Sequence, residues 1–509
     1  MDALEQQADR LFEERKYPEA LDIYLSLAQK YPKAEKYSMY CGSCFDAIGQ
    51  AEQAVKFYKK ASKQNPVSVQ SLLALANLYY HNQNYDEALR FAQLVLKKEP
   101  KNVSALLVIA NVAYCKNDYE RAFELYEQIH LIDPSNYVAL VNMANTAYDL
   151  GRFVKAAEFA QEACQINPSS VDAYIISGNS YMELNRIEKA ETNLLKALGL
   201  RGDNPWIYNA LSRLYQKTED YKSALAFGWK SVLFGASAQN EQHINFGYLL
   251  YECACEGKEV LAKNYALKWI DAFPQNDMVA YMAGAILNER KFKKADEGYV
   301  TQVFDMFAND FDTTLKGLEY MAPTYIASAV KEHYNVGFFK KTNYLDLGCG
   351  TGLCALNVKK QLFRSYIVGV DLSLKMLEQA RLKNIYDVLE QDDLLHFLQT
   401  DSRTYDLITA ADVLTYFGDL REVFENAANR LKLGGLFVFT ISENAQTKDD
   451  YLLTPSGRFV HHLDYISGLL KKCGYSKLSF ERKALRNEGD KVVWGYVVVA
   501  EKIMILKRV

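Results

Sequence analysis

The sequence lacks several features that would place the protein in a membrane or an oxidising compartment. No apolar run approaches the roughly 20 residues that a membrane-spanning helix needs. The first residues, MDALEQQADRLFEER, do not have the basic-then-apolar order of a signal peptide. The nine cysteines follow no disulfide framework, and no cluster of cysteine, histidine or carboxylate has the spacing of a metal site. We therefore expect a cytoplasmic protein without membrane attachment or bound metal.

A large excess of charge is also missing. Lys and Arg number 59 against 63 Asp and Glu, for a formal net charge of -4, which predicts no general attraction to nucleic acid or anionic membranes. The composition, 49% hydrophobic and 24% charged, is typical of a folded globular protein. At 509 residues the chain is too long for one ordinary core, so two or more domains are expected.

Proline is scarce, yet half of the ten prolines fall on a single period of 34 residues. Alanines and a series of small residues keep the same interval. This period predicts one helical hairpin per repeat, in which small residues let two helices approach closely and the proline ends the second helix. The three series are Pro32, Pro66, Pro100, Pro134 and Pro168; Ala20, Ala54, Ala88, Ala122, Ala156 and Ala190; and Ala8, Gly42, Ala76, Ala110, Ala144 and Gly178.

The pattern resembles the tetratricopeptide repeat (TPR) over residues 1–296, with a looser register beyond Leu200. The resemblance implies an all-α solenoid of about eight or nine repeats, with a groove lined by the first helix of each repeat. Groove positions would hold an asparagine ladder and a tyrosine ladder that bind a protein or peptide through its backbone. Alternatively, the asparagines bond within and between repeats. The ladder residues are Asn77, Asn111, Asn145, Asn179, Tyr80, Tyr114 and Tyr148.

One class of partner is disfavoured by the same resemblance. Family members that clamp the C-terminal carboxylate of chaperones carry a lysine four residues before the ladder asparagine. Here those positions are apolar, so a chaperone-tail clamp is not expected. The residues are Leu73, Leu107, Val141 and Ile175.

Beyond residue 296 apolar strand-like runs alternate with helical segments, and two strand-like runs flanking RNEGD end the chain. The alternation predicts a doubly wound α/β fold over 341–509, with a mostly parallel seven-stranded sheet and an antiparallel pair at its end. In such a sheet the ligand lies beyond the carboxyl ends of the strands.

The first of these strands runs into the spacing D-x-G-x-G-x-G, from Asp346 to Gly352. A dinucleotide fingerprint, G-x-G-x-x-G, would need a glycine where Leu353 stands. The observed spacing resembles class I S-adenosylmethionine-dependent methyltransferases, and RLKLGG supports it, with Leu433 in place of the usual proline. The whole chain resembles predicted bacterial TPR–methyltransferase fusions. The resemblance implies S-adenosylmethionine as cofactor, bound by Asp346, Gly348, Gly350, Gly352, Asp371, Leu372, Asp392, Asp393 and Asp412, with Asp392 favoured over Asp393 for the adenine.

The segment 297–340 is expected to connect the two regions and to cover the cofactor. Residues 304–318 have an apolar face at helical spacing, and Tyr320 is the candidate cofactor contact. After the fourth strand, Asp412 and Tyr416 are candidate catalytic residues. His461 is the candidate base and Arg458 a candidate substrate contact. Alternatively, the segment is a surface loop with solvated histidines.

The sequence therefore predicts a methyltransferase whose solenoid recruits a protein or peptide substrate or partner. The absence of an NPPY loop argues against the glutamine and adenine N-methyltransferases. The alternatives are a TPR scaffold with an inactive methyltransferase domain and, disfavoured by Leu353, a dinucleotide oxidoreductase.

Overall fold

The computed structural model describes residues 3–235, 240–289, 292–334, 341–362, 364–445, 447–488 and 491–503. Contacts divide the chain into two compact units, Met1–Thr218 and Glu219–Val509. The described part of the first unit is helical, and the second contains helices and a sheet.

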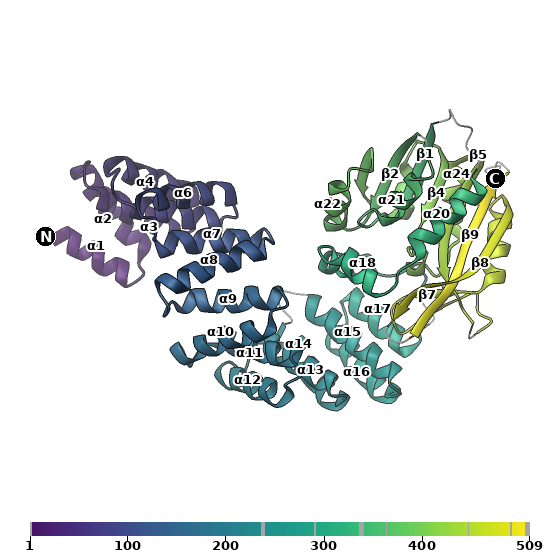
Figure 1. Ribbon diagram of the computed structural model, residues 1–509, viewed down its shortest axis with the longest axis horizontal. Coiled ribbons are helices and arrows are strands. Elements are labelled where there is room, and N and C mark those ends of the chain that lie inside the picture. The colour runs from purple at the N-terminus through teal and green to yellow at the C-terminus, as the bar shows by residue number, and fades with distance from the viewer. Residues whose placement is uncertain are drawn as a thin grey trace. The chain divides into compact units, whose positions relative to one another are not determined.

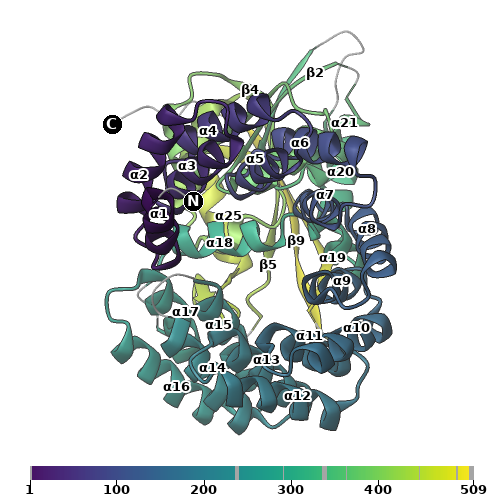
Figure 2. The ribbon, with the colours of Figure 1, turned by 90° about the vertical axis from the view of Figure 1, so that its left-hand side faces the viewer.

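The first unit is a stack of antiparallel helices in which each helix packs on the next along the chain (Figure 1, Figure 2). This arrangement confirms the predicted all-α solenoid. The helices are α1 (Ala3–Glu13), α2 (Tyr17–Lys30), α3 (Glu35–Ala47), α4 (Ala51–Gln64), α5 (Gln70–His81), α6 (Tyr85–Lys98), α7 (Val103–Cys115), α8 (Tyr119–Ile132), α9 (Tyr137–Asp149), α10 (Phe153–Ile166), α11 (Val171–Glu183), α12 (Ile187–Leu200) and α13 (Pro205–Lys217).

The periodic prolines and polar residues set the ends of these helices. α2, α4, α6, α8 and α10 each end two residues before a periodic proline, which cannot continue the helical hydrogen bonds. The next helix then begins at a polar N-cap. The Oδ1 atoms of Asn102 and Asn136 accept from the backbone N–H of Ala105 and Ala139, both at 3.0 Å.

The small residues of the repeat lie where the two helices of a hairpin meet. Ala76, Ala110 and Ala144 are fully buried. A Cβ on Gly42 would lie 2.5 Å from the Tyr58 ring, and one on Gly178 would lie 2.6 Å from Cγ of Leu194. Glycine therefore replaces alanine where a large side chain of the second helix fills the position.

A pair of glycine substitutions tests this close approach. Both Gly178→Ala and Gly199→Ala should gain up to ~1 kcal/mol of helix propensity. A Cβ at Gly199 meets no atom within 4 Å, whereas one at Gly178 meets Leu194. Gly178→Ala should therefore be less stable than Gly199→Ala by ~1–3 kcal/mol in chemical denaturation of the full chain. Equal stability of the two variants would show that α11 and α12 are farther apart than described.

The second unit begins with four helices that continue the helical part of the sequence, and it also contains the sheet. By their contacts these helices belong with the sheet, whereas the repeat pattern in the sequence includes them and extends to residue 296. The domain limits at 296 and 340 remain predictions of the sequence. The helices are α14 (Tyr221–Gly235), α15 (Asn240–Cys255), α16 (Glu259–Ala272) and α17 (Asp277–Leu287).

The seven-stranded sheet of this unit has the order β3-β2-β1-β4-β5-β9-β8. The first five strands are parallel, while β9 pairs antiparallel with both β5 and β8, which confirms the predicted fold class. Residues 489–490 of the expected final turn lie outside the described residues. The strands are β1 (Thr342–Leu347), β2 (Ser365–Asp371), β3 (Val388–Gln391), β4 (Tyr405–Ala410), β5 (Leu431–Ser442), β8 (Tyr475–Glu488) and β9 (Lys491–Lys502).

Helices cover both faces of the sheet. Alternate residues of β5 point to opposite faces, so Val438 joins Tyr344 and Ile326 in one core while Phe437 and Phe439 pack with Phe424 in the other. A small hairpin of β6 (Tyr451–Leu453) and β7 (Phe459–His461) lies outside the main sheet. The remaining helices are α18 (Glu297–Phe307), α19 (Phe311–Gly317), α20 (Ala322–His333), α21 (Leu353–Lys359), α22 (Leu374–Leu382), α23 (Leu394–Thr400), η1 (Leu414–Tyr416), α24 (Arg421–Arg430) and α25 (Leu463–Lys472).

In the described part of the chain, every helix is too short or too polar to cross a lipid bilayer.

Candidate active site

A cavity of about 740 Å³ lies in the second unit, along the carboxyl ends of the parallel strands. The turns that follow β1, β2, β3 and β4 all contribute to its wall. The ligand sites of doubly wound sheets occur at this edge, and the volume falls in the range of roughly 300–1,000 Å³ that is typical of small-molecule pockets. The cavity is therefore the candidate active site.

The glycine-rich turn after β1 forms one side of the cavity. Gly348, Gly350 and Gly352 have φ values of 59°, 51° and 92°, a region that side chains disfavour. A Cβ on Gly348 would lie 2.3 Å from Val413. A Cβ on Gly350 would project toward the cavity, where its nearest atom is Cε1 of Phe311, at 3.9 Å. The missing side chain of Gly350 thus leaves the backbone open to a ligand.

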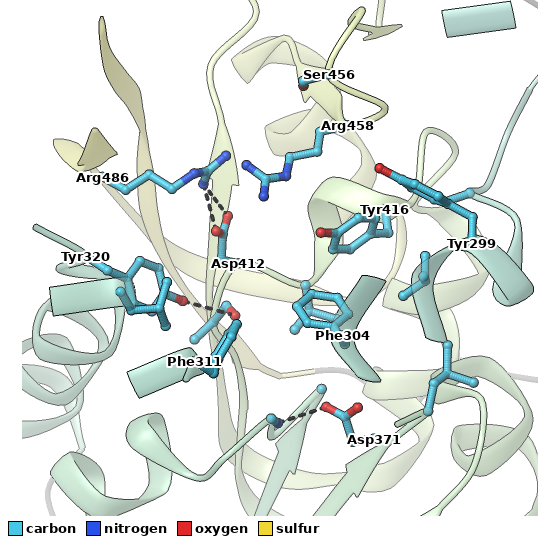
Figure 3. Close-up of a pocket in the computed structure, with 18 of the residues that line it drawn as sticks. Tyr299, Phe304, Phe311, Tyr320, Asp371, Asp412, Tyr416, Ser456, Arg458 and Arg486 are labelled. Atoms are coloured by element: carbon cyan, nitrogen blue, oxygen red, sulfur yellow. Dashed lines mark hydrogen bonds and ion pairs between the residues drawn. The ribbon is translucent and has the colours of Figure 1, made fainter. Parts of the chain in front are cut away.

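Asp371 ends β2 beside this turn and is fixed by two backbone hydrogen bonds (Figure 3). Gly350 N–H donates to Oδ2 at 2.8 Å, and Ser373 N–H donates to Oδ1 at 2.9 Å. Burial, with the nearby Asp346 and Asp305 charges, outweighs these hydrogen bonds and raises the pKa of Asp371 to about 6. Asp371 is therefore a positioned acceptor whose charge is lost just below neutral pH.

Two further carboxylates follow β3 and line the cavity. Oδ1 of Asp393 caps α23 by accepting from the N–H groups of Leu395 and His396, and its Oδ2 lies 2.8 Å from Nζ of Lys294. Asp392 is 2.8 Å from Nδ1 of the exposed His396. Its Oδ2 lies 2.9 Å from the same nitrogen, and its Oδ1 also accepts from the Asp393 N–H at 2.8 Å. Both carboxylates are therefore engaged, and the geometry does not decide between them for a ligand contact.

Helices α18 and α19 also line the cavity. Ser373 Oγ donates to Oδ1 of Asp305 at 2.5 Å, and Nζ of Lys383 lies 2.6 Å from Oδ2 of Asp312. Tyr320 lines the cavity, and its hydroxyl donates to the Ala411 carbonyl at 3.5 Å. The expected helix over 304–318 is corrected to two helices that break at residues 308–310. The break lets both Phe304 and Phe311 face the cavity (Figure 3).

The opposite end of the cavity from Asp371 is strongly polar (Figure 3). Asp412 has a left-handed backbone, with φ of 58°, and Nη1 of Arg486 lies 2.7 Å from both of its carboxylate oxygens. Arg486 also donates to Oε1 of Glu488, from Nε at 2.9 Å and from Nη2 at 2.8 Å. Arg458 forms a further ion pair with the same Glu488 oxygen. Two arginines and two carboxylates therefore form one network beside Tyr416.

Helix α15 supplies the remaining wall, including Tyr248 and Tyr251. The segment between α17 and α18 ties these helices to the turn after β4. Gly418 N–H donates to the Lys293 carbonyl at 2.7 Å, and Ala295 N–H donates to the Tyr416 carbonyl at 2.8 Å. Helices that continue the helical part of the sequence therefore form part of the cavity itself.

The structure brings together most of the residues that the sequence predicted for the site. Asp346 does not line the cavity: it is buried and accepts from Thr409 and Tyr386 at 2.7 and 2.8 Å. Gly352 does not line it either. The predicted residues on its wall are Gly348, Gly350, Asp371, Leu372, Asp392, Asp393, Asp412, Tyr416 and Arg458.

The expectation that His461 is the base is corrected by its surroundings. Its ring is fully buried outside the cavity wall and stacks on Tyr465, and Nε2 lies 2.8 Å from the Phe417 carbonyl oxygen. Burial lowers the pKa of His461 to about 4. The imidazole is thus a neutral donor that holds the turn after η1.

Arg486, Glu488, Tyr248, Tyr251 and Tyr299 also line the cavity, and the sequence analysis missed them. They come from β8, α15 and α18, and no local motif marks them. Within the described residues, histidine, cysteine and carboxylate side chains nowhere gather in a group of three or more that could hold a metal.

In the first unit, part of the asparagine ladder bonds between repeats. Asn111 Oδ1 accepts from Tyr126 at 2.6 Å and from Asn142 at 3.1 Å, and Asn145 Nδ2 donates to the Tyr114 hydroxyl at 2.7 Å. The Tyr114 hydroxyl donates in turn to Asp149, and the Tyr148 hydroxyl donates to Glu183. Tyr80 lies 3.8 Å from the sulfur of Cys115.

Two asparagines of the ladder have surroundings that differ from those of Asn111 and Asn145. Asn77 is exposed. Oδ1 of Asn179 is buried without a hydrogen-bond partner among the described residues.

Comparison with known families agrees with both parts of this architecture. Residues 345–437 match the family described as a methyltransferase domain. Residues 5–69 and 47–111 match tetratricopeptide repeat families, and residues 103–216 match a family of helical repeats described as the TT21 fifth ARM repeats domain. The α/β domain is therefore a methyltransferase domain.

Curated relatives match the methyltransferase part. The mitochondrial ubiquinone biosynthesis O-methyltransferase of Candida albicans is 31% identical over 106 residues, which cover 20% of this chain and 32% of the relative. The ubiquinone biosynthesis O-methyltransferase of Aliivibrio fischeri is 30% identical over 147 residues, 27% of this chain and 59% of the relative. The malonyl-[acyl-carrier protein] O-methyltransferase of Bacillus anthracis is 27% identical over 97 residues, 19% and 36% of the two chains. The chain thus spans about a third to three fifths of the length of these relatives.

Two solved structures are also similar to parts of this chain. Pseudomonas aeruginosa PilF has 16% identity and a TM-score of 0.39, over 44% of this chain and 99% of that one. YrrB, a TPR protein, has 16% identity and a TM-score of 0.32, over 37% and 96%. The family matches by themselves show that the chain carries tetratricopeptide repeats and a methyltransferase domain in one polypeptide.

The buried neutral His461 predicts a specific pH dependence of stability. A folded-state pKa of about 4 lies below the ordinary 6.5, so the unfolded chain binds the proton more readily and stability falls as pH decreases through this interval. His461→Gln keeps a neutral hydrogen-bond donor that does not titrate. Its free energy of unfolding should therefore fall by up to ~3 kcal/mol less than that of the wild type over this pH interval. The free energy of unfolding of each variant, measured between pH 7 and 4.5, checks this.

His462→Gln provides the matched control, because its side chain is 34% exposed. If the free energy of unfolding of His461→Gln fell with pH as steeply as that of the wild type, the assignment of a buried neutral imidazole would be contradicted.

Proposed function

We propose that the chain is a class I methyltransferase that uses S-adenosylmethionine and acts in the cytoplasm. One observation carries the proposal: Gly350 N–H donates to the Asp371 carboxylate at 2.8 Å, at the edge of a cavity beside glycines with positive φ. This arrangement suits a ribose held by a carboxylate next to an exposed backbone.

The residues present fit that cofactor. Asp371 uses one lone pair of each oxygen for a backbone N–H, which leaves acceptor capacity for two ribose hydroxyls. Asp392 lines the cavity and could accept from the adenine amino group beside its contact with the exposed His396. The open backbone at Gly350 and the Tyr320 ring provide close surfaces. When bound, the cofactor supplies a methyl group on a positively charged sulfur.

The chain's own contribution is then binding, alignment and exclusion of water. The Asp305–Ser373 and Asp312–Lys383 contacts hold α18 and α19 over the cavity, where Phe304 and Phe311 replace solvent. Methyl transfer is an in-line displacement, so alignment of acceptor and methyl provides much of the acceleration.

We further propose that the TPR unit recruits a protein or peptide substrate or partner. The number of stacked hairpins in this unit supports the proposal, since a small metabolite does not require so long a surface. Within the ladder, exposed Asn77 is the better candidate for contact, because Asn111 and Asn145 bond between repeats and Oδ1 of Asn179 is buried.

Cofactor binding tests the first proposal directly. Asp371→Asn should weaken binding of S-adenosylhomocysteine by ~1.5–3 kcal/mol, the scale of a lost hydrogen bond to a charged group. Because protonation removes the same charge, wild-type affinity should fall as pH decreases from 7.5 to 5.5, through the raised pKa of about 6. The affinity of Asp371→Asn should be less sensitive to this change. Calorimetric titration measures both effects.

Asp464→Asn serves as the control, since the Asp464 side chain is 93% exposed on α25. NADH should not bind any of the three proteins. Binding of NADH, or wild-type affinity for S-adenosylhomocysteine in Asp371→Asn, would contradict the proposed cofactor site.

Peptide binding tests the second proposal. Peptides selected from a random library on the full-length protein should bind Asn77→Ala about fivefold more weakly, since one neutral hydrogen bond of about 1 kcal/mol is lost. Asn193→Ala is the control, because Asn193 lies on the outer helix α12 and donates to the Lys189 carbonyl. Peptides whose binding is unchanged in Asn77→Ala would exclude a groove site at this asparagine.

A further inference from the structure

The two arginines at the polar end of the cavity differ in their exposure and in how many of their N–H donors are engaged. The Arg486 side chain is only 4% exposed, and its guanidinium already contacts both oxygens of Asp412 and one of Glu488. The Arg458 side chain is 31% exposed although it is enclosed by the cavity wall, so its exposed surface faces the cavity (Figure 3).

Arg458 retains donors for a ligand. Its ion pair with Glu488 is made through Nη1, and it also hydrogen-bonds Tyr416. A guanidinium carries five N–H donors in a planar fork that matches a carboxylate, so donors remain beside these two contacts. Glu488 is also held by Arg486 at 2.8 Å. Arg458 can therefore turn toward an incoming anion without leaving Glu488 unpaired.

The local charge favours an anionic acceptor. Arg458 and Arg486 balance Asp412 and Glu488 at this end of the cavity. The sulfonium of the proposed cofactor adds one positive charge, which an acceptor anion would neutralise. In an enclosed, partly apolar cavity this pairing is stronger than in water.

The same residues give no ready base for an acceptor that carries a proton. Both oxygens of Asp412 lie 2.7 Å from Arg486. Burial alone would raise the pKa of Glu488, but Arg458 and Arg486 outweigh it and lower the pKa. His461 lies outside the cavity wall. An acceptor that is already deprotonated at neutral pH fits these surroundings best.

We propose that the acceptor is a carboxylate held by Arg458, and that the product is its methyl ester. The inference rests on the proposed cofactor. An acceptor oxygen forms a bond to the methyl carbon while the methyl–sulfur bond breaks and its electron pair stays on sulfur. The negative charge of the carboxylate and the positive charge of the sulfonium both disappear, and no proton is released.

The rest of the wall restricts the body of the acceptor. Tyr248 and Tyr251 of α15 and Tyr299 of α18 surround the space next to Arg458 with aromatic surface. Glu256 and Glu297 also line the cavity, and their exposure puts them at its opening. Glu297 is paired with Lys294, which also lines the cavity. Glu256 therefore supplies the negative charge that disfavours a second anionic group, and we expect a monocarboxylate with an apolar or cationic body and not a nucleotide or a phosphate ester.

Paired probes test the recognition step on the full-length protein saturated with S-adenosylhomocysteine. The small-molecule pair is 4-phenylbutyrate and its amide, and the peptide pair is acetyl-Ala-Ala-Phe with a free or amidated C-terminus. In at least one pair the carboxylate should bind about tenfold or more tightly than the amide, as expected for a charged hydrogen bond. The pair that shows the preference identifies a metabolite or a peptide as the source.

Arg458→Gln should abolish the preference while leaving the affinity for S-adenosylhomocysteine unchanged. It should also fold, because Glu488 remains paired with Arg486. Arg482→Gln is the matched control: this arginine lies on β8, pairs with Glu443 and does not line the cavity. Equal binding of acid and amide in both pairs, or a preference that survives in Arg458→Gln, would overturn the proposal.

The product provides a second readout that is independent of the probes. With tritiated S-adenosylmethionine and a cell extract, the label incorporated by the wild type should be released as volatile methanol by mild alkali, as methyl esters are. Label that resists alkali would overturn the carboxylate assignment but leave the methyltransferase proposal standing. Failure of S-adenosylhomocysteine to bind would overturn the cofactor proposal instead, and carboxylate binding to Arg458 would then be measured on the protein alone.

Discussion

A short backbone pairing between residues 293–295 and 416–418 holds the cavity together. Gly418 N–H donates to the Lys293 carbonyl, and Ala295 N–H donates to the Tyr416 carbonyl. These bonds fix the turn after β4 against the segment between α17 and α18. Backbone hydrogen bonds are insensitive to side-chain identity, so they set the geometry of the wall while leaving its side chains open to variation. The positions of Tyr416, of α18 and of the α15 wall all depend on this pairing.

The enclosed wall in turn decides which chemistry the polar end supports. A buried arginine or carboxylate is stable only when it is paired, which explains why Arg486, Asp412 and Glu488 form one network. In the proposed reaction two opposite charges vanish, and surroundings of low polarity favour such a step because they solvate the separated charges less well than water. The helices that exclude solvent and the ion pairs that fix the acceptor therefore act on the same step.

The sequence predicted the features that depend on local pattern. The 34-residue period determines helix ends and close approaches, and the glycine spacing marks the turn before Asp371 because both are contiguous in the chain. The contribution of Arg486 and Tyr248 depends on tertiary contacts between distant segments, which no local motif specifies. His461 was misjudged because the extended chain at β7 turns alternate side chains to opposite sides, and which of them faces the cavity depends on tertiary packing against the turn after η1.

The loosened repeat register after Leu200 has a physical explanation in the second unit. A Cβ on Gly247 would lie 2.0 Å from Met282, and one on Gly284 would lie 2.4 Å from Phe292, so these glycines accommodate large neighbours as Gly42 and Gly178 do in the first unit. Tyr281 donates to the Gly457 carbonyl at 2.7 Å, directly beside Arg458. Helix α17 thus packs both on its neighbouring helices and on the turn of the β6–β7 hairpin. Its sequence departs from the 34-residue pattern because that pattern specifies packing against another repeat only.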